Sequence, residues 1–199
     1  MLYTGKGDGG TTKVFGCDQQ RISKASELPE ALGALDELNS FLGVAKAHTS
    51  AALQPVWWGV IYGKEDYLIP GTDSQKLSMV LREVQEALFI VQAETAGADK
   101  RLSKAHVDRV EHMTNAIEKE IPPIKSFSIA GGTELSAMLD VARTFARRAE
   151  RRLVAVNDAG VRALSPDTKA YMNRLSSLLF ALARLANHRA GIAEENPRY

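Results

Sequence analysis

Arginine is concentrated in one stretch of the sequence, where five arginines and a single acid fall within ten residues. The residues of this cluster are Arg143, Arg147, Arg148, Glu150, Arg151 and Arg152. Spacings of three and four place Arg143, Arg147 and Glu150 on one side of a helix. Guanidinium groups are planar forks suited to phosphates and to desolvated carboxylates. The cluster therefore fits two interpretations, a solvated basic flank or a site that binds an anion.

A second candidate for anion binding is the stretch of residues 3–13, which reads Tyr-Thr-Gly-Lys-Gly-Asp-Gly-Gly-Thr-Thr-Lys. Glycine amides, threonine hydroxyls and lysine ammonium groups are all donors that can wrap a phosphate. Gly5, Gly7 and Gly10 match the spacing of the dinucleotide fingerprint, but that interpretation fails because no strand precedes them and no long helix follows directly. No Gly-Lys-Ser/Thr closes a Walker pattern either. A phosphate loop and a flexible terminal tail remain as the two interpretations.

Composition excludes several classes of protein. A length of 199 residues predicts one domain with a sizeable core, or one with an ordered insertion. A formal charge of +1 predicts no nucleic acid partner and no anionic membrane partner. The single Cys17 excludes an internal disulfide framework and a Cys-rich zinc site, and it fits a reducing compartment. No apolar run reaches the ~18 residues of a membrane span. Because the first motif begins at Tyr3, no room is left for a signal peptide, and we expect a cytoplasmic protein.

Apolar residues recur with helical spacing in five segments, and no segment shows convincing strand alternation. The predicted helices are residues 30–48, 77–98, 104–120, 133–156 and 165–190. The fourth begins at Thr133, a suitable N-cap, and its apolar face is Leu135, Met138, Ala142, Ala146, Ala149 and Leu153. Residues 54–75 are rich in aromatic side chains, which favours an ordered insertion over a mobile lid. With residues 191–199 as a frayed tail, the chain is predicted to be an all-α, up-and-down bundle.

Several polar or aromatic residues interrupt this apolar pattern. Asp36 lies among leucines, and it is either an exposed acid favoured by the helix dipole or a partner for one of the arginines. Phe127 lies in an extended connector and is either a buried anchor or the apolar wall of a pocket. His106 and His112 have no carboxylate at ligand spacing, so we interpret them as surface or boundary residues. The last helix carries a second stripe made of Asn173, Ser176, Ser177, Phe180, Arg184 and Asn187.

Three stretches in a fixed order carry a combined motif. They read Tyr-Thr-x-x-Gly-Asp-x-Gly-Thr-Thr at residues 3–12, Asp-Glu-Leu-Asn at 36–39 and Ala-Arg-x-x-x-Arg-Arg-Ala-Glu-Arg at 142–151. Arg-x-Ser-Lys at residues 21–24 and Asn-Arg-Leu-Ser at 173–176 add to the pattern. Together they resemble the ATP:cob(I)alamin adenosyltransferases of the propanediol-utilisation type, and the resemblance covers nearly the whole chain.

The resemblance implies a transferase that moves the 5′-deoxyadenosyl group of ATP to the cobalt of cob(I)alamin, or of cob(I)yrinic acid a,c-diamide, and releases triphosphate. It implies a homotrimer of ferritin-like bundles with ATP and Mg²⁺ bound between neighbouring subunits. A cobalamin reductase and a cobalamin-dependent acceptor enzyme would be partners. Cob(I)alamin would itself be the nucleophile, which agrees with the lack of a nucleophile, general base or metal triad in the sequence.

The resemblance also assigns roles to residues. The ATP loop would be residues 1–24, with Thr4, Gly5, Lys6, Gly7, Thr12, Lys13 and Lys24 folded over the triphosphate. The nucleotide site would be completed by Arg147, Arg148, Glu150, Arg151 and Asn173. Asp36 would pair with Arg143 across the subunit boundary beneath the corrin ring. Phe127 would lie at the lower face of the cobalt, with Phe180 nearby.

The sequence departs from the family pattern at a few positions. Ala130 replaces the usual proline before two glycines, and Asp140 replaces a histidine. Residues 25–29 stand where the family has Asp-Pro-Arg, so one basic contact to ATP would be missing. The insertion at residues 54–75 is also atypical. We expect these changes to affect affinity and lid behaviour more than the reaction.

Two other classes of protein compete with this interpretation. A ferritin-like di-iron carboxylate protein would need Glu-x-x-His pairs on two helices, and none of the four histidines has a glutamate three residues earlier. A non-catalytic helical module, such as a cobalamin chaperone or sensor, would keep the bundle and lose the ATP loop. Failure to bind ATP would favour that second class.

Overall fold

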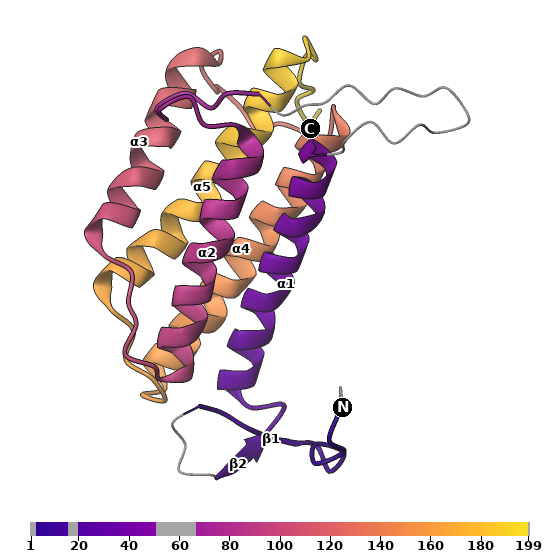
Figure 1. Cartoon of the computed structure of the whole chain (residues 1–199). Helices are drawn as coiled ribbons and strands as arrows, with labels where there is room; N and C mark the ends of the chain where they lie inside the picture. Colours follow the sequence, from indigo (N-terminus) through magenta and orange to yellow (C-terminus); the bar gives the residue numbers. More distant parts are fainter. Residues whose placement is uncertain (1–2, 16–19, 51–66, 199) are drawn as a thin grey trace.

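The computed structural model describes residues 3–15, 20–50 and 67–198, and over these residues the chain forms a bundle of five helices (Figure 1). The helices are α1 (Glu27–Ser50), α2 (Leu77–Ala96), α3 (Lys104–Glu120), α4 (Glu134–Asp158) and α5 (Pro166–Arg189). Helix α5 packs against α3 and α4, and α1 packs against α2 and α4. The prediction of an all-α bundle is confirmed. Among the described helices, none combines the length and apolarity that a membrane span requires.

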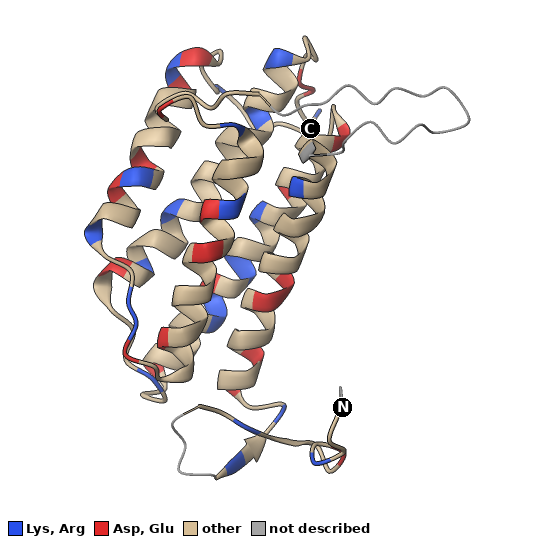
Figure 2. Cartoon of the chain, in the orientation of Figure 1, with Lys and Arg blue, Asp and Glu red and all other residues tan. Residues whose placement is uncertain are grey.

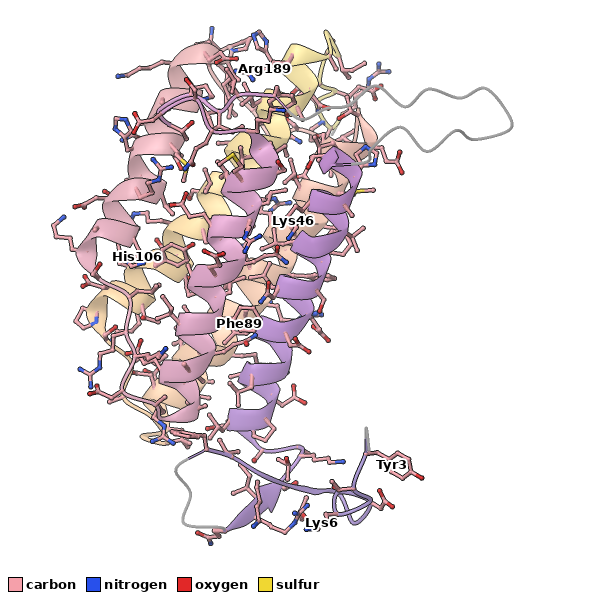
Figure 3. The ribbon with its side chains drawn as sticks, viewed as in Figure 1. Tyr3, Lys6, Lys46, Phe89, His106 and Arg189 are labelled. Carbon is pink, nitrogen blue, oxygen red and sulfur yellow. The ribbon has the colours of Figure 1, made fainter. Side chains whose placement is uncertain are left out.

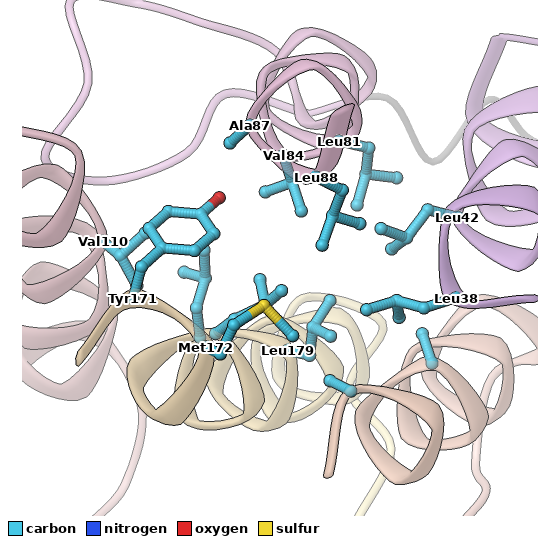
Figure 4. Close-up of a cluster of buried hydrophobic side chains, with 14 of the residues drawn as sticks. Leu38, Leu42, Leu81, Val84, Ala87, Leu88, Val110, Tyr171, Met172 and Leu179 are labelled. Carbon is cyan, nitrogen blue, oxygen red and sulfur yellow. The ribbon is translucent and has the colours of Figure 1, made fainter. Parts of the chain in front are cut away.

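The core lies between the long helices and consists almost entirely of aliphatic side chains (Figure 4). The buried side chains that meet there from α1, α2 and α5 include Leu38, Leu42, Leu81, Leu88, Met172 and Leu179. Each such side chain contributes about 1.5–3 kcal/mol when it leaves water. On α4 the predicted apolar face is buried except for Met138, which is half-buried. Burial also raises the pKa of the Tyr171 hydroxyl, which lies at the edge of this cluster.

The helix ends follow from local capping. Thr133 accepts a hydrogen bond from the Ser136 amide (3.0 Å), and Ser165 accepts one from the Thr168 amide (3.2 Å), as expected for N-caps. Helix α1 begins at Glu27, earlier than the predicted residue 30. Pro29 is tolerated there because amides in the first turn have no intrahelical acceptor.

The prediction that the chain contains no strand is wrong. Strands β1 (Thr11–Lys13) and β2 (Arg21–Ser23) form a short antiparallel pair in which Thr12 lies opposite Ile22. A two-stranded ribbon is marginal by itself, but Arg21 reinforces this one. Its Nε donates to Thr11 Oγ1 (2.8 Å), and a terminal nitrogen donates to the carbonyls of Lys6 and Thr11, both at 2.6 Å. Strands of three residues are too short for alternation to be recognised in a sequence.

The prediction of a frayed tail is wrong for residues 191–198. The tail returns along the connector of residues 121–133, which joins α3 to α4. The Ile129 amide donates to the Glu195 carbonyl (2.8 Å), and Ser128 Oγ donates to the Glu194 carboxylate (2.9 Å). Between connector and tail lies a pocket of about 330 Å³, which we call the connector pocket. The tail is therefore part of the fold at the end of the bundle opposite the N-terminal strands (Figure 1).

Most of the predicted insertion, residues 54–66, lies outside the described residues. The described chain resumes at Tyr67, and Leu68 pairs with Lys76 in an isolated antiparallel bridge. Arg189 lies over the Tyr67 ring at 4.7 Å from its centroid and donates to the Leu68 carbonyl (2.5 Å). Figure 3 shows Arg189 at the end of the bundle opposite the N-terminal strands. The end of the segment before α2 is thus attached to the end of α5.

Candidate functional site

A pocket of about 360 Å³ lies between α3, α4 and α5, and we call it the arginine groove. It is lined by Thr114, Glu118, Ile121, Ile124, Arg143, Arg147, Ser176, Ser177, Phe180 and Ala181. Three members of the predicted polar stripe of α5 are among these residues. Acidic and basic residues both occur over the bundle (Figure 2), so the charge of the groove depends on which bases have an acid partner.

The five arginines of α4 divide between two sides of the helix. Arg148 forms an ion pair with Glu37 and lies over the Phe145 ring, and Arg152 pairs with Glu30 at 3.5 Å. Both acids belong to α1, so these two arginines face α1 rather than the groove. The chain by itself therefore does not bring Arg148 to the arginine groove.

Arg147 and Arg151 are exposed on the other side of α4, and neither has a hydrogen bond or ion pair with any residue that the structure describes. Glu150 lies between them in sequence and accepts a hydrogen bond from Asn173 Nδ2 of α5 (2.9 Å). This contact brings together two of the predicted nucleotide residues. The result is a half-exposed polar surface with free guanidinium groups beside an acid and an amide, an arrangement suited to a nucleotide triphosphate.

Arg143 is held at the wall of the groove by a residue that the sequence did not assign to the site. Its Nε donates to Asp140 Oδ1 (3.0 Å), and the other Asp140 oxygen accepts from Arg184 (2.6 Å). The Phe180 ring lies against both guanidinium groups, at 6.0 Å from Arg143 and 5.0 Å from Arg184. The signal in the sequence was an acid three residues before an arginine on the same helix.

Asp36 and Phe127, the two remaining catalytic candidates, both face solvent in the single chain. Asp36 is exposed on α1 and has no ion pair within the described ranges. Phe127 lies in the connector with 78% of its surface exposed, so it is not a buried anchor. An exposed aromatic side chain on a connector remains consistent with the apolar wall of a substrate site.

The N-terminal residues assemble into one loop. Lys24 donates its amide to the Gly10 carbonyl (2.9 Å), and its ammonium group lies so close to Gly7 that a Cβ there would be 3.0 Å from Nζ. Thr12 lies in the neighbouring strand β1. Thr4, Gly5 and Lys6 precede this pair in an exposed turn in which the Asp8 amide donates to the Gly5 carbonyl (3.2 Å). Most of the predicted triphosphate contacts thus lie together.

This loop projects beyond the start of α1, away from the connector end of the bundle (Figure 1). Figure 3 shows Tyr3 and Lys6 in this projecting segment, below the helices. Val14 and Ile22 pack against the core and attach the segment to it. The arginine groove, in contrast, includes Ile121 and Ile124 of the connector end. Arg147 lies further along α4, and Arg152, five residues on, pairs with Glu30 in the first turn of α1, so the groove extends from the connector end toward the end that carries the loop.

Asn187 of α5 organises the chain just before α4. Its Oδ1 accepts from the Thr133 amide (3.0 Å), and its Nδ2 donates to the Gly131 carbonyl (2.9 Å). Gly132 has a φ of +103°, and a Cβ on it would lie 2.3 Å from Asn187 Oδ1. Both the backbone conformation and the close approach thus require glycine at residue 132.

We expect Gly132→Ala to lower the free energy of unfolding by more than about 2 kcal/mol, because backbone strain adds to the collision with Asn187. Urea denaturation monitored by circular dichroism would measure the loss. Gly131→Ala is the matched control, since Gly131 also has a positive φ (+129°) but a Cβ there meets no atom within 4 Å. Equal losses in the two variants would mean that the Asn187 contact contributes nothing.

Comparison with known proteins points to one family. Residues 2–186 match a family model described as cobalamin adenosyltransferase. The chain is 36% identical over 197 residues to the corrinoid adenosyltransferase of Bacillus subtilis, covering 97% of this chain and 90% of the relative. It is 35% identical over 202 residues to the corrinoid adenosyltransferase of Mycobacterium leprae, covering 94% and 91%.

Solved structures agree with this result. A Phe-to-His variant of the PduO-type ATP:corrinoid adenosyltransferase from Lactobacillus reuteri, complexed with cobalamin and ATP, is similar with a TM-score of 0.80 at 29% identity. The match covers 100% of this chain and 97% of that one. An Arg-to-Lys variant of the same kind of enzyme, complexed with ATP, is similar with a TM-score of 0.78 at 29% identity, covering 99% and 100%.

Proposed function

The chain belongs to the cobalamin adenosyltransferase family, and on this premise we propose which of its residues bind each of its two substrates. As a PduO-type ATP:corrinoid adenosyltransferase, it transfers the 5′-deoxyadenosyl group of ATP to the cobalt of cob(I)alamin and releases triphosphate. The observation that carries the assignment is Arg147, which has no acid partner among the described residues and faces the arginine groove beside the Glu150–Asn173 pair.

Arg147 and Arg151 bind the triphosphate, and Glu150 with Asn173 binds the remainder of the nucleotide. The carbon–oxygen bond between the ribose 5′-carbon and the triphosphate breaks as the bond to cobalt forms, so negative charge grows on the leaving oxygen. Fixed guanidinium groups stabilise that charge without having to reorganise. Arg148 contributes only if a neighbouring subunit displaces Glu37 from it.

The N-terminal loop covers the triphosphate of a neighbouring subunit in a homotrimer. Support comes from its place in the fold, because the loop projects beyond the end of its own bundle. Thr4, Gly5, Lys6, Gly7, Thr12, Lys13 and Lys24 supply amides, hydroxyls and ammonium groups. A contact between different surfaces of two subunits closes into a ring, as a trimer requires.

Mg²⁺ fits this site as an ion carried by the triphosphate. Magnesium in such sites takes few protein ligands and several phosphate oxygens or waters. Within the described part of the chain, no group of three or more His, Cys, Asp or Glu side chains could hold a metal ion by itself. The loop hydroxyls of Thr4 and Thr12 are the nearby oxygen ligands that would complete its coordination.

The corrinoid binds against the connector. Phe127 supplies an exposed apolar ring that would exclude water and a lower axial ligand from the cobalt. Asp36 of one subunit pairs with Arg143 of the next, and Phe180 packs behind that arginine. The cytoplasmic location, the cobalamin reductase and the cobalamin-dependent acceptor enzyme belong to the same proposal.

The reaction is tested by mixing the protein anaerobically with chemically reduced cob(I)alamin and MgATP while the corrin absorbance is followed. We expect conversion to adenosylcobalamin with one triphosphate released per corrinoid. ATP binding without conversion would contradict the corrinoid assignment. If the protein neither binds ATP nor forms adenosylcobalamin, a non-catalytic helical module is favoured.

The shared site is tested by mixing two inactive variants. Lys24→Ala damages the loop and Arg147→Ala damages the groove. If the site lies between subunits, an equal, co-refolded mixture should regain activity at about a quarter of the interfaces. Half of the subunits carry an intact loop and the other half an intact groove, so random assembly brings the two intact parts together at about one interface in four. Light scattering would report the mass of the oligomer. No recovery in a mixture that forms trimers would place both halves in one chain.

A further inference from the structure

Two buried charged residues lie next to Arg143, which lines the arginine groove. Asp140 of α4 is 4% exposed and Arg184 of α5 is 3% exposed, and they form an ion pair of 2.6 Å. Arg184 also lies 2.7 Å from the Glu194 carboxylate of the tail. Counting Arg143, the cluster contains two acids and two bases, so its charge is balanced. Burial of charged groups is costly unless they are paired in this way.

The pairing is specific at the level of atoms. Asp140 Oδ1 accepts from Arg143 Nε, and Asp140 Oδ2 accepts from a terminal nitrogen of Arg184. Arg143 is thus held through Nε only. Its two terminal nitrogens have no partner among the residues that the structure describes, and its side chain is 27% exposed. The guanidinium is fixed at its base while the two groups that bind an acid or an anion stay available.

We propose that Asp140 is a positioning residue for Arg143, and that it presents the terminal nitrogens of this arginine to the corrinoid site. Arg184 donates a hydrogen bond to Asp140, and the Phe180 ring lies against the guanidinium groups of Arg143 and Arg184. A free arginine side chain has several rotatable bonds, so it loses conformational entropy when it binds a partner. The hydrogen bond from Arg143 Nε to Asp140, which we call the clamp, restricts the side chain beforehand and so lowers that cost. The inference rests on the proposed function, in which Arg143 meets Asp36 of a neighbouring subunit beneath the corrin ring.

The competing explanation is structural: Asp140 would serve only to neutralise Arg184 inside the bundle. The two explanations differ in how mutations combine. If Asp140 acts through Arg143, removing the clamp has no further effect once Arg143 has lost its Nε donor. If Asp140 only stabilises the bundle, the two losses are independent and multiply.

The experiment is a double-mutant cycle of Asp140→Asn and Arg143→Lys, with prereduced cob(I)alamin and MgATP as substrates. We expect Asp140→Asn to raise the KM for the corrinoid about tenfold while the KM for ATP changes less than about twofold. The double variant should match Arg143→Lys alone. Losses that multiply, or equal increases in both KM values, would overturn the proposal.

The matched control is Glu94→Gln. Glu94 is also a buried carboxylate (5% exposed), and it accepts hydrogen bonds from the Ser165 amide (2.6 Å) and the Thr168 hydroxyl (2.5 Å) at the other end of α5. We expect this variant to lose thermal stability with an unchanged corrinoid KM. If Glu94→Gln raises the corrinoid KM as much as Asp140→Asn does, the effect comes from stability and the proposal fails.

A second measurement is independent of activity. In protein labelled with ¹⁵N-arginine, we expect the Nε–H of Arg143 to exchange with solvent more than about tenfold more slowly than that of Arg147, which has no described partner. Asp140→Asn should remove the difference. Equal exchange in the unmodified protein would show that the clamp is absent. Slow exchange in a protein that makes no adenosylcobalamin would refute the proposed function and leave the clamp intact.

Discussion

Arg147→Ala is expected to lower kcat about 30- to 10³-fold, equivalent to roughly 2–4 kcal/mol of lost transition-state stabilisation. Arg147 lines the arginine groove, is exposed, and has no acid partner among the described residues. Its charge is therefore free for an incoming triphosphate. Because charge on the leaving oxygen grows mainly in the transition state, the loss should fall on kcat more than on the KM for ATP.

The matched control for this prediction is Arg152→Ala. It removes the same charge from the same helix, but Arg152 pairs with Glu30 on the α1 side. An exposed pair of this kind is worth less than about 1 kcal/mol, so stability and kcat should change little. Steady-state kinetics with cob(I)alamin and MgATP would compare the two variants. A kcat for Arg147→Ala equal to that of the control would remove Arg147 from the mechanism.

The second large effect is expected for Phe127→Ala. We expect the reaction that starts from cob(II)alamin to slow at least tenfold more than the reaction supplied with cob(I)alamin, an order-of-magnitude estimate based on the cofactor environment that the protein must provide. Reduction of bound cobalt(II) requires loss of its lower axial ligand. A large apolar ring at that face favours the four-coordinate state. The reaction supplied with cob(I)alamin does not include this reduction, so it should depend less on the ring.

Phe89→Ala provides the control, because Phe89 is an exposed phenylalanine on α2, 64% exposed against 78% for Phe127 (Figure 3 labels Phe89). It should affect neither reaction. Anaerobic assays from both oxidation states would give the two rates for each variant. Equal losses of the cobalt(II) and cobalt(I) reactions in Phe127→Ala would refute the proposal that the ring excludes the lower axial ligand.

The helices of this protein could be predicted because their causes are local. Ser103 and the Ile121-Pro122-Pro123 stop delimit α3, and the predicted range of residues 104–120 is the observed one. Thr133 caps α4 as predicted, and Ser165, the first residue of the last predicted helix, caps α5. Capping and hydrophobic periodicity depend on residues within a turn or two, so a single sequence contains them in full. The motifs of the family are equally local, and they identified the reaction.

The contacts that complete the site are not local, and only the tertiary structure decided them. Arg147 and Arg148 are neighbours in sequence, yet Arg148 pairs with an acid 111 residues away, whereas Arg147 has no partner in the part of the chain that the structure describes. Asp140 finds Arg184 44 residues further on, which the spacing of either helix could not predict.

The same reason explains the two wrong predictions. The tail of residues 191–198 is ordered by hydrogen bonds to a connector that precedes it by more than 60 residues, such as that of Ser128 with Glu194 at a separation of 66. Strands β1 and β2 depend on Arg21 reaching back to Lys6 and Thr11. The sequence by itself determined the helices, the residue types of the site and the family. The packing of α4 against both α1 and α5 decided which charges are paired and which are free, because pairing requires proximity in space and not in sequence.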